Sequence, residues 1–371
     1  MDITIIGAGI VGLSITANVA RKGREVLLVE KHTRFGQETS SRNSQVVHAS
    51  IYYPAGFLKG QLCLEGNELM YKLCEDKNIP CKNLGKLIVA VNEKEEAMLE
   101  NLMKMGEANG AKGLKIIPGK KVNELEPNVK ATAAIVCPTS GIVDTHQLMQ
   151  YWEIHARKMG AEIAYGVEVK GIEKTGNGYR VEVIDADGKQ FDFQTRILIN
   201  SAGLNSGNVA AMAGIDIDRA GYRINHLKGM YFRVGNGKEK MARMLIYPVP
   251  PKPGSVGVHT VPELDGGMRL GPHDVWIDEI EYHVDESLRD LFYSEVKSFL
   301  PFIEPEDLYP DTAGIHPKVQ KPGEPMKDFI IAHETTKGLP GLINLVGIES
   351  PGVTASPAIG HYVARMVEEI I

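Results

Sequence analysis

The hydrophobic pattern at the start of the chain predicts a β-α-β unit. Residues 3–6 are an apolar, β-branched run, the segment GAGIVG follows, and apolar positions with helical spacing continue through Ala20. A basic turn and a glycine at residues 21–23 end this predicted helix. Residues 25–30 then form a second apolar strand, which ends in Glu30. These elements have the order of a β-α-β unit.

Helical and strand patterns alternate along the rest of the chain. Helical spacing predicts helices over residues 58–78 and 93–109, and polar-apolar alternation over 163–199 predicts antiparallel strands with turns at GNG and DADG. The run ILINSAG (197–203) predicts a strand that ends in a small-residue turn. The later predicted elements are strands over 221–283 with Pro- and Gly-rich turns such as YPVPPKPG (247–254), a helix over 286–299, a final strand over 342–347 and a closing helix with Ser356 and Pro357 near its start. This alternation predicts a mixed α/β and α+β fold with two interleaved domains.

Composition and charge narrow the range of functions. The chain has 371 residues, of which 43% are hydrophobic and 24% are charged, as in ordinary globular proteins. Its net charge of −6 argues against a nucleic-acid partner or an anionic membrane surface, since neither attracts a negative protein. The cysteines show no CxxC pair, so we expect free thiols and no metal site. They are Cys63, Cys74, Cys81 and Cys137.

We expect neither a transmembrane segment nor a signal peptide. The chain has no apolar run of about 18 residues, the length that a spanning helix needs. Asp2 stands where a signal peptide has a basic region, and no small-residue cleavage site follows an apolar core. The expected location is therefore the cytoplasm.

The glycine spacing after the first strand predicts a dinucleotide site. Gly7, Gly9 and Gly12 form GxGxxG directly after a strand and at the start of a helix. The first glycine permits a tight turn, the second lets the backbone approach a pyrophosphate, and the third lets the helix pack close to the strand. Glu30, at the end of the next strand, can accept hydrogen bonds from ribose hydroxyls and argues against a 2′-phosphate. The fingerprint alone leaves NAD and FAD open.

The segment after Glu30 favours FAD. It contains a hydroxyl- and amide-rich stretch that suits additional phosphate and ribityl oxygens, and it then reaches His48 and two tyrosines. The stretch comprises Thr39, Ser40, Ser41, Asn43 and Ser44. On composition alone, a polar loop with an ordinary histidine explains this segment equally well.

Segments throughout the chain resemble the flavoprotein superfamily of D-amino-acid oxidase, glycine oxidase, sarcosine oxidase and glycerol-3-phosphate dehydrogenase. Within it they are most similar to the L-2-hydroxyglutarate dehydrogenase family. The segments are SSRNSQVVHASIYYPAGFLKGQLCLEG (40–66), GKLIVAV (85–91), CPTSGIVD (137–144), VEVKGIE (167–173), SAGL (201–204), IYPVP (246–250), GVHTVPELDGGMRLGP (257–272) and ESPGVTASPAIG (349–360). Because they occur in order along nearly the whole chain, the resemblance is more specific than any single motif.

The resemblance implies FAD as the cofactor and assigns residues to it. The ADP half would be held by Gly7, Gly9, Ile10, Gly12, Glu30 and Lys31, the pyrophosphate and ribityl chain by Ser41, Arg42 and Asn43, and the adenine by the backbone of Val169. Ala202 and Gly203 would pass beside the dinucleotide, His48 would lie by the isoalloxazine ring, and Gly347, Ser350, Gly352 and Val353 would surround the flavin pyrimidine edge. No cysteine follows Cys137, which excludes a cysteine tether from the C-terminal region, and we expect FAD to be non-covalent.

The resemblance also implies a reaction. It is the oxidation of a 2-hydroxy acid, L-2-hydroxyglutarate or a similar acid, to the 2-oxo acid by hydride transfer to flavin N5. His48 and His259 are the candidate bases, since imidazole titrates near neutral pH. The candidates for binding the substrate carboxylate are Tyr53, Lys228, His316 and Lys318. The chain departs from the family at two of them, because Lys228-Gly229 replaces an Arg-Gly pair and His316 in AGIHPK replaces an arginine.

Several alternatives stay open at this point. The same scaffold could act on amino acids, on amines or on glycerol 3-phosphate, and an NAD-dependent dehydrogenase or a flavin-binding protein without catalysis would share part of the pattern. The partner is expected to be a small-molecule carboxylate, and the electron acceptor is open between oxygen, a quinone and a protein. A quinone acceptor would place the protein peripherally at a membrane.

The predicted architecture is a Rossmann-type FAD-binding domain interleaved with an antiparallel-sheet substrate domain. Residues 1–85, 145–220 and 315–371 are assigned to the FAD-binding domain. Residues 86–144 and 221–314 are assigned to the substrate domain.

Overall fold

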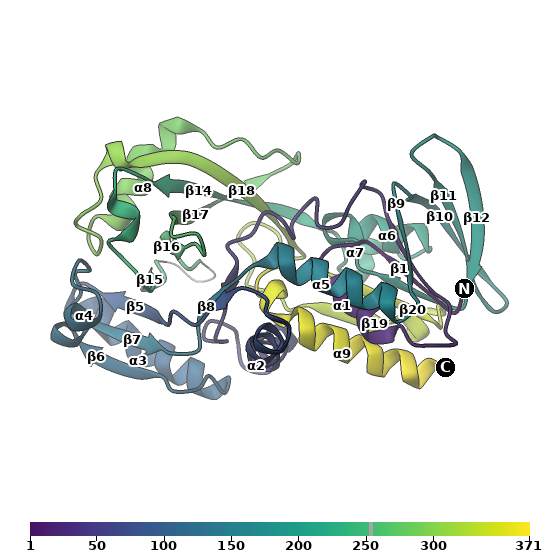
Figure 1. Ribbon diagram of the computed structural model, residues 1–371, viewed down its shortest axis with the longest axis horizontal. Helices are drawn as coiled ribbons and strands as arrows, with labels where there is room; N and C mark the ends of the chain where they lie inside the picture. Colours follow the sequence, from purple (N-terminus) through teal and green to yellow (C-terminus); the bar gives the residue numbers. More distant parts are fainter. Residues whose placement is uncertain (252–254) are drawn as a thin grey trace. The chain divides into compact units, whose positions relative to one another are not determined.

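The computed structural model describes residues 1–251 and 255–371, which form two compact units (Figure 1). Unit 1 consists of residues 1–41, 145–226 and 316–371, and unit 2 consists of residues 42–144 and 227–315. Each unit is therefore assembled from segments that are distant in the sequence.

Unit 1 is built on a six-stranded sheet with the order β19-β20-β13-β1-β2-β9. The strands from β20 to β9 are parallel, and β19 is antiparallel to β20. Their bounds are β1 (Ile3–Ile6), β2 (Val26–Glu30), β9 (Glu162–Tyr165), β13 (Ile197–Asn200), β19 (Ile330–His333) and β20 (Leu342–Val346). Every residue of β1, β13 and β20 is buried, because these central strands are covered on both faces.

Helices and a second sheet complete unit 1. Helix α1 (Ile10–Val19) packs against both α5 (Thr145–Lys158) and α9 (Gly352–Ile370), which lie alongside it in Figure 1. The antiparallel sheet β10-β11-β12 shares a hydrophobic core with the main sheet, and α6 (Ser206–Met212) contacts both β10 and β20. The bounds of the remaining α-helix and strands are α7 (Ile217–Ala220), β10 (Glu168–Thr175), β11 (Gly178–Ile184) and β12 (Gln190–Thr195).

Unit 2 contains three sheets and four α-helices among the described residues. The sheet orders are β16-β17-β14-β18, β15-β5-β7-β6 and β3-β8-β4. The strands are β3 (Val46–Val47), β4 (Cys81–Lys82), β5 (Lys86–Ala90), β6 (Lys115–Pro118), β7 (Ala133–Cys137), β8 (Gly141–Val143), β14 (Asn225–Val234), β15 (Leu245–Pro248), β16 (His259–Pro262), β17 (Met268–Ile277) and β18 (Leu308–Lys318). The helices are α2 (Leu58–Lys77), α3 (Glu93–Ala108), α4 (Gly119–Leu125) and α8 (Arg289–Val296).

The structure differs from the predicted element pattern in several places, since α4, α5, α6 and α7 lie where no helix was predicted. Within 163–199 only β10 to β12 are antiparallel, whereas β9 pairs in parallel with β2 at the edge of the main sheet. Helix α9 begins at Gly352, before the predicted start, so Pro357 lies inside it. The hydroxyl of Ser356 donates to the carbonyl of Val353 at 2.8 Å, which supplies a donor that the Pro357 nitrogen lacks. Part of the predicted turn at 247–254 lies outside the described residues.

The compact units also divide the chain differently from the predicted domains. Residues 42–85 belong to unit 2 rather than to the nucleotide-binding part. The reason is strand pairing: β3 and β4 both pair with β8, and β8 lies in unit 2. A short strand that pairs with a distant partner leaves little periodic signal in the sequence, so its place in the fold was not visible there.

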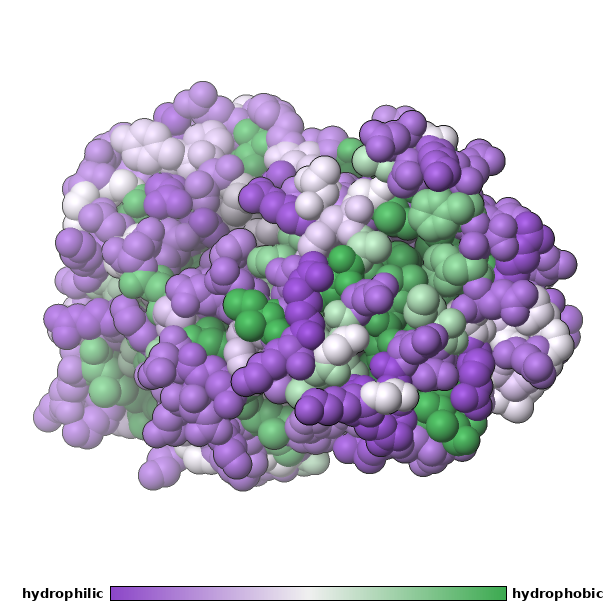
Figure 2. All heavy atoms as spheres, turned by 45° about the vertical axis from the view of Figure 1, so that its right-hand side comes forward, coloured by the Kyte–Doolittle hydropathy of each residue, from purple (hydrophilic) through white to green (hydrophobic). Residues whose placement is uncertain are grey.

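The surface of the protein is mixed in character. On the face drawn in Figure 2, hydrophobic residues form patches separated by hydrophilic ones. No helix in the described part of the chain combines the length and the apolar composition that crossing a membrane requires.

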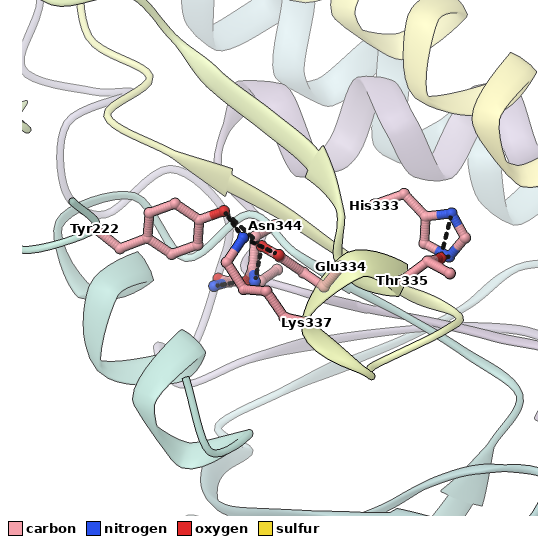
Figure 3. Close-up of polar contacts among 7 residues, drawn as sticks. Tyr222, His333, Glu334, Thr335, Lys337 and Asn344 are labelled. Carbon is pink, nitrogen blue, oxygen red and sulfur yellow. Dashed lines mark hydrogen bonds and ion pairs between the residues drawn. The ribbon is translucent and has the colours of Figure 1, made fainter. Parts of the chain in front are cut away.

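A buried carboxylate ties together the C-terminal part of unit 1 (Figure 3). Glu334 is fully buried, and its Oε1 accepts hydrogen bonds from the Tyr222 hydroxyl at 2.7 Å and from the Asn344 amide at 2.8 Å. Its Oε2 accepts from Lys337 at 2.7 Å. Asn344 also accepts from the amide of Asn200 at 2.8 Å, so the network links β20 to β13. Because each buried polar group has a partner, the network stabilises the unit.

Removing this carboxylate should destabilise the protein. Glu334→Ala leaves the buried Tyr222 hydroxyl and the Asn344 amide without their acceptor, so we expect a loss of roughly 2–5 kcal/mol in the free energy of unfolding. Glu324 is a matched control, because its ion pair with Lys327 has the same spacing but is exposed, and Glu324→Ala should cost less than about 1 kcal/mol. Denaturant unfolding measures both values, and equal stability of the two variants would contradict this role of Glu334.

Candidate functional site

The turn from β1 to α1 forces two polypeptide segments into close contact. Gly7 has φ +103°, and a Cβ atom there would lie 2.7 Å from the carbonyl oxygen of Ser201. A Cβ atom at Gly12 would lie 2.0 Å from the carbonyl oxygen of Gly7. Only glycine fits these positions, as the predicted fingerprint requires. The helix therefore begins directly at the end of β1, where N–H groups of its first turn can bind a diphosphate.

Glu30 is held in place by backbone groups at the same end of the sheet. Its side chain is buried, Oε2 accepts from the N–H of Ala8 at 2.7 Å, and Oε1 accepts from the N–H of His32 at 2.8 Å. Each carboxylate oxygen has a second lone pair, so both can still accept from vicinal ribose hydroxyls. Lys31, predicted beside it, forms an ion pair with Glu38 at 2.6 Å.

Further predicted cofactor residues lie at the carboxyl ends of neighbouring parallel strands. Ala202 and Gly203 follow β13, and a Cβ atom at Gly7 would lie 3.2 Å from the Cα atom of Ala202. Gly347 follows β20, Ser350 precedes α9, and Gly352 and Val353 are the first two residues of α9. The carboxyl edge of an open parallel sheet is where such folds bind nucleotides.

Three other predicted cofactor residues of unit 1 are Val169, Ile10 and Ser41, and each is held by packing or by a hydrogen bond. Val169 is a buried β10 residue at a register shift, and it shares a core with β1 and β2. The N–H of Ile10 donates to the Ser40 hydroxyl at 3.0 Å, and the Ser41 hydroxyl donates to the Glu38 carbonyl at 3.1 Å.

Arg42 and Asn43 belong to unit 2. The guanidinium of Arg42 lies 4.1 Å from the centre of the Tyr282 ring. The side chain of Asn43 accepts from the N–H of Gln45 at 2.8 Å.

The residues of unit 1 fit FAD. The glycines leave room for a diphosphate at a helix N-terminus, and Glu30 presents free lone pairs where a ribose would lie. The described residues contain no cluster of three or more His, Cys, Asp or Glu side chains that could hold a metal ion.

Three of the four substrate-binding candidates already face carboxylates. The ammonium of Lys228 contacts Glu281 and the carbonyl of His283. The ammonium of Lys318 contacts Glu349, and the Nδ1 atom of His316 lies 3.6 Å from the same carboxylate. Tyr53, the fourth candidate, is buried, and its carbonyl accepts from Asn109 at 2.7 Å.

The two candidate bases lie in unit 2 in different environments. His48 is half-buried beside β3, and its carbonyl accepts from the Asn67 amide at 2.9 Å. His259 is buried on β16, with Nδ1 2.8 Å from the carbonyl oxygen of Gly257 and its ring stacked on Tyr247 at 3.6 Å. Burial lowers the pKa of His259 to about 3, so its imidazole is neutral and weakly basic at pH 7.

A cluster that sequence reasoning missed surrounds Lys86 at the start of β5. Lys86 is 1% exposed, and its Nζ atom lies 3.9 Å from the Tyr247 ring centre and 5.5 Å from the Tyr52 ring centre. No described carboxylate pairs with it, and the hydroxyls of Tyr52 and Tyr247 have no hydrogen-bond partner among the described residues. We call Lys86, Tyr52, Tyr247 and His259 the lysine cluster. Only the unusual lysine at the head of the apolar run KLIVA hints at it in the sequence.

Burial strongly affects the charge of Lys86. It lowers the pKa of this ammonium from 10.5 to about 8, because the cation has lost its water without gaining a carboxylate. The neighbouring thiols of Cys63 and Cys137 stay protonated, since burial raises the pKa of each to about 12. Lys86 is therefore a buried cation at pH 7 surrounded by neutral groups, an arrangement that costs stability.

Replacing Glu30 should weaken FAD binding. Glu30→Ala removes an acceptor for charge-assisted hydrogen bonds to ribose, so we expect a loss of roughly 1.5–3 kcal/mol in FAD affinity. Titration of the apoprotein with FAD measures the loss. Glu25→Ala is the control, because Glu25 immediately precedes the same strand and is exposed. Equal FAD affinities of the two variants would remove Glu30 from the site.

Replacing Lys86 should stabilise the fold at neutral pH. Lys86→Met removes the buried charge and keeps an apolar chain, so we expect a gain on the order of 1–3 kcal/mol at pH 7. Between pH 8 and 10.5 the folded protein has released this proton while the unfolded chain still holds it. The free energy of unfolding of the wild type therefore rises relative to that of the variant as the pH increases through this range. Denaturant unfolding at pH 7 and at pH 9.5 measures the difference. A variant less stable than wild type at pH 7 would contradict the assignment, and Lys115→Met, at an exposed position of the same sheet, is the control.

Comparisons with known proteins identify relatives along the whole chain. The FAD dependent oxidoreductase family matches residues 2–366. The mitochondrial L-2-hydroxyglutarate dehydrogenase of Arabidopsis thaliana is 34% identical over 402 residues, covering 98% of this chain and 83% of the relative. A glycerol 3-phosphate dehydrogenase of Caloramator mitchellensis is 28% identical over 372 residues, covering 100% of this chain and 74% of the relative. The dithionite-reduced L-α-glycerophosphate oxidase of Mycoplasma pneumoniae with FAD bound has a TM-score of 0.87 and 27% identity, covering 99% of this chain and 94% of that chain.

These matches confirm the predicted superfamily, the predicted fold class and FAD as the cofactor. They also set aside the alternative of a flavin-binding protein without catalysis. They give no support to the predicted cytoplasmic location, since the Arabidopsis relative is named as mitochondrial, and the location stays a prediction. The chain belongs to the FAD-dependent oxidoreductase family and is an enzyme that uses FAD.

Proposed function

We propose that this enzyme oxidises a 2-hydroxy acid, L-2-hydroxyglutarate or a similar acid, to the 2-oxo acid. The observation that carries the proposal is the similarity to the Arabidopsis L-2-hydroxyglutarate dehydrogenase, which extends over 98% of this chain and 83% of that protein. Similarity over such a length includes both compact units, and it is therefore not a property of the nucleotide-binding part alone.

The residues of unit 1 hold the cofactor in this proposal. The N-terminus of α1 binds the diphosphate, and Glu30 accepts from the ribose hydroxyls. Ser350, just before α9, and Gly352 and Val353, at its start, would hold the flavin pyrimidine edge, where a positive helix end would stabilise negative charge. FAD, when bound without a covalent link, supplies the hydride acceptor.

His48 is the proposed base that accepts the proton of the substrate hydroxyl. A base works best when its pKa lies near the working pH, and burial takes His259 far below that range. The neutral His259 suits hydrogen bonding to substrate instead. Lys228, His316 and Lys318 are weaker candidates for the substrate carboxylate than the sequence suggested, because each faces a carboxylate of the protein.

Oxidation of glycerol 3-phosphate is the second candidate function. Two observations favour it: the glycerol 3-phosphate dehydrogenase among the relatives and the TM-score of 0.87 to an L-α-glycerophosphate oxidase. The first candidate is preferred because the dehydrogenase from Arabidopsis is more similar in sequence, at 34% against 28% and 27% identity.

An anaerobic substrate screen tests the proposed function. L-2-Hydroxyglutarate should bleach the flavin absorbance of the holoenzyme faster than glycerol 3-phosphate or any amino acid at equal concentration. Bleaching by glycerol 3-phosphate alone would establish the second candidate. Bleaching by an amino acid alone would establish an amine-oxidising enzyme, and either result would overturn the proposal.

Replacing His48 should slow the chemistry without removing the cofactor. His48→Asn should reduce the rate of anaerobic flavin reduction by about 10²–10⁴-fold, the usual contribution of a general base. The FAD content, measured from absorbance, should stay near that of wild type. His146→Asn, at an exposed histidine, is the control. Normal reduction by His48→Asn, with an unchanged pH profile, would exclude His48 as the base.

A further inference from the structure

The lysine cluster carries three buried hydrogen-bond donors without acceptors among the described residues. They are the ammonium of Lys86 and the hydroxyls of Tyr52 and Tyr247. Tyr247 and Lys86 are each 1% exposed, so ordinary solvent contact does not satisfy them. Buried donors of this kind normally have partners, and their occurrence within one cluster indicates a ligand with oxygen acceptors.

We infer that Lys86, together with the hydroxyls of Tyr52 and Tyr247, binds an anionic oxygen group of the substrate, which is a carboxylate in the proposed 2-hydroxy acid. The identity of the acid rests on the proposed function. The binding site itself rests on the geometry of the lysine cluster, in which the Tyr52 and Tyr247 rings stack at 6.5 Å and both lie beside the ammonium.

The other lysines and the histidine considered for this role already face carboxylates of the protein. Lys228 is also buried, but its charge is balanced by Glu281. Lys318 shares Glu349 with His316. A carboxylate that approached either lysine would compete with the carboxylate already there, whereas at Lys86 it would meet an unbalanced cation. Tyr52 is half-buried as a residue, although its hydroxyl is buried.

The surroundings of Lys86 give the site a pH dependence of known sign. The groups that face the ammonium are the thiols of Cys63 and Cys137, the two tyrosines and His259. Burial raises the pKa of both thiols to about 12, raises the pKa of both phenols and lowers the pKa of His259 to about 3. Lys86, with a pKa of about 8, is the group among them that titrates near neutral pH. Anion binding should therefore be strong below pH 8 and weaken above it.

Calorimetric titration of the FAD-loaded enzyme with glutarate tests this inference. Glutarate has two carboxylates and no hydroxyl to oxidise, so its binding is measured without turnover. At pH 7, Lys86→Met should raise the dissociation constant by about 10- to 100-fold, and Tyr247→Phe by a smaller factor of about 2 to 10. Lys115→Met, at an exposed position of β6, should bind glutarate as wild type does. Wild-type affinity should fall as pH rises above 8, whereas the affinity of Lys86→Met should not follow this profile.

The outcomes separate this inference from the proposed function. If L-2-hydroxyglutarate bleaches the flavin but Lys86→Met binds glutarate as tightly as wild type, the inference is wrong and the proposed function stands. If no hydroxy acid bleaches the flavin, the proposed function is wrong. The same titration with inorganic phosphate and glycerol 3-phosphate then still tests whether Lys86 binds an anion. Binding of phosphate but not glutarate through Lys86 would overturn the carboxylate assignment. Should Lys86→Met fail to fold, the glutarate affinity of Tyr247→Phe and the pH profile of the wild type test the inference. Unchanged affinity in Tyr247→Phe together with a wild-type affinity that does not fall above pH 8 would overturn it.

Discussion

The close contact between α1 and the ends of β1 and β13 is the constraint on which unit 1 depends. A Cβ atom at Gly12 would overlap the carbonyl of Gly7, and one at Gly7 would overlap that of Ser201. Because these positions lack side chains, the helix begins at the carboxyl edge of the sheet with its N–H groups directed outwards. The same contact brings the N–H of Ala8 to the carboxylate of Glu30. Cofactor recognition thus follows from how closely two backbones approach.

The two units differ in how a buried charged side chain is paired. In unit 1 the buried carboxylate of Glu334 accepts from Tyr222, Lys337 and Asn344, and the network stabilises the fold. In unit 2 the ammonium of Lys86 is buried against aromatic rings and thiols without a described carboxylate. A buried charge that costs folding free energy and pairs with no described carboxylate is most simply explained by an anionic partner outside the chain. Stability and substrate binding therefore oppose each other at this residue.

Local signals in the sequence predicted the fold better than the site. The glycine spacing, the apolar strands and Glu30 act over about thirty residues, so the first β-α-β unit was visible. Strand β9 was misjudged because it is only four residues long and its parallel partner β2 is far away in the sequence, so no local pattern reveals the pairing. Some contacts of the site join residues that are far apart in the chain, such as Lys228 with Glu281 and Lys86 with Tyr247. Such contacts leave no periodic pattern in the sequence. The sequence therefore pointed to Lys228 and Lys318, which are paired with carboxylates, and not to the buried Lys86, which pairs with no described carboxylate.

In the proposed reaction the enzyme removes a hydride from the hydroxyl-bearing carbon of a 2-hydroxy acid. Single-turnover flavin reduction under anaerobic conditions, with L-2-hydroxyglutarate carrying hydrogen or deuterium at C2, tests it most directly. We expect full bleaching of the flavin and a slower rate with the deuterated acid. Absence of bleaching by either form, with the enzyme loaded with FAD, would contradict it.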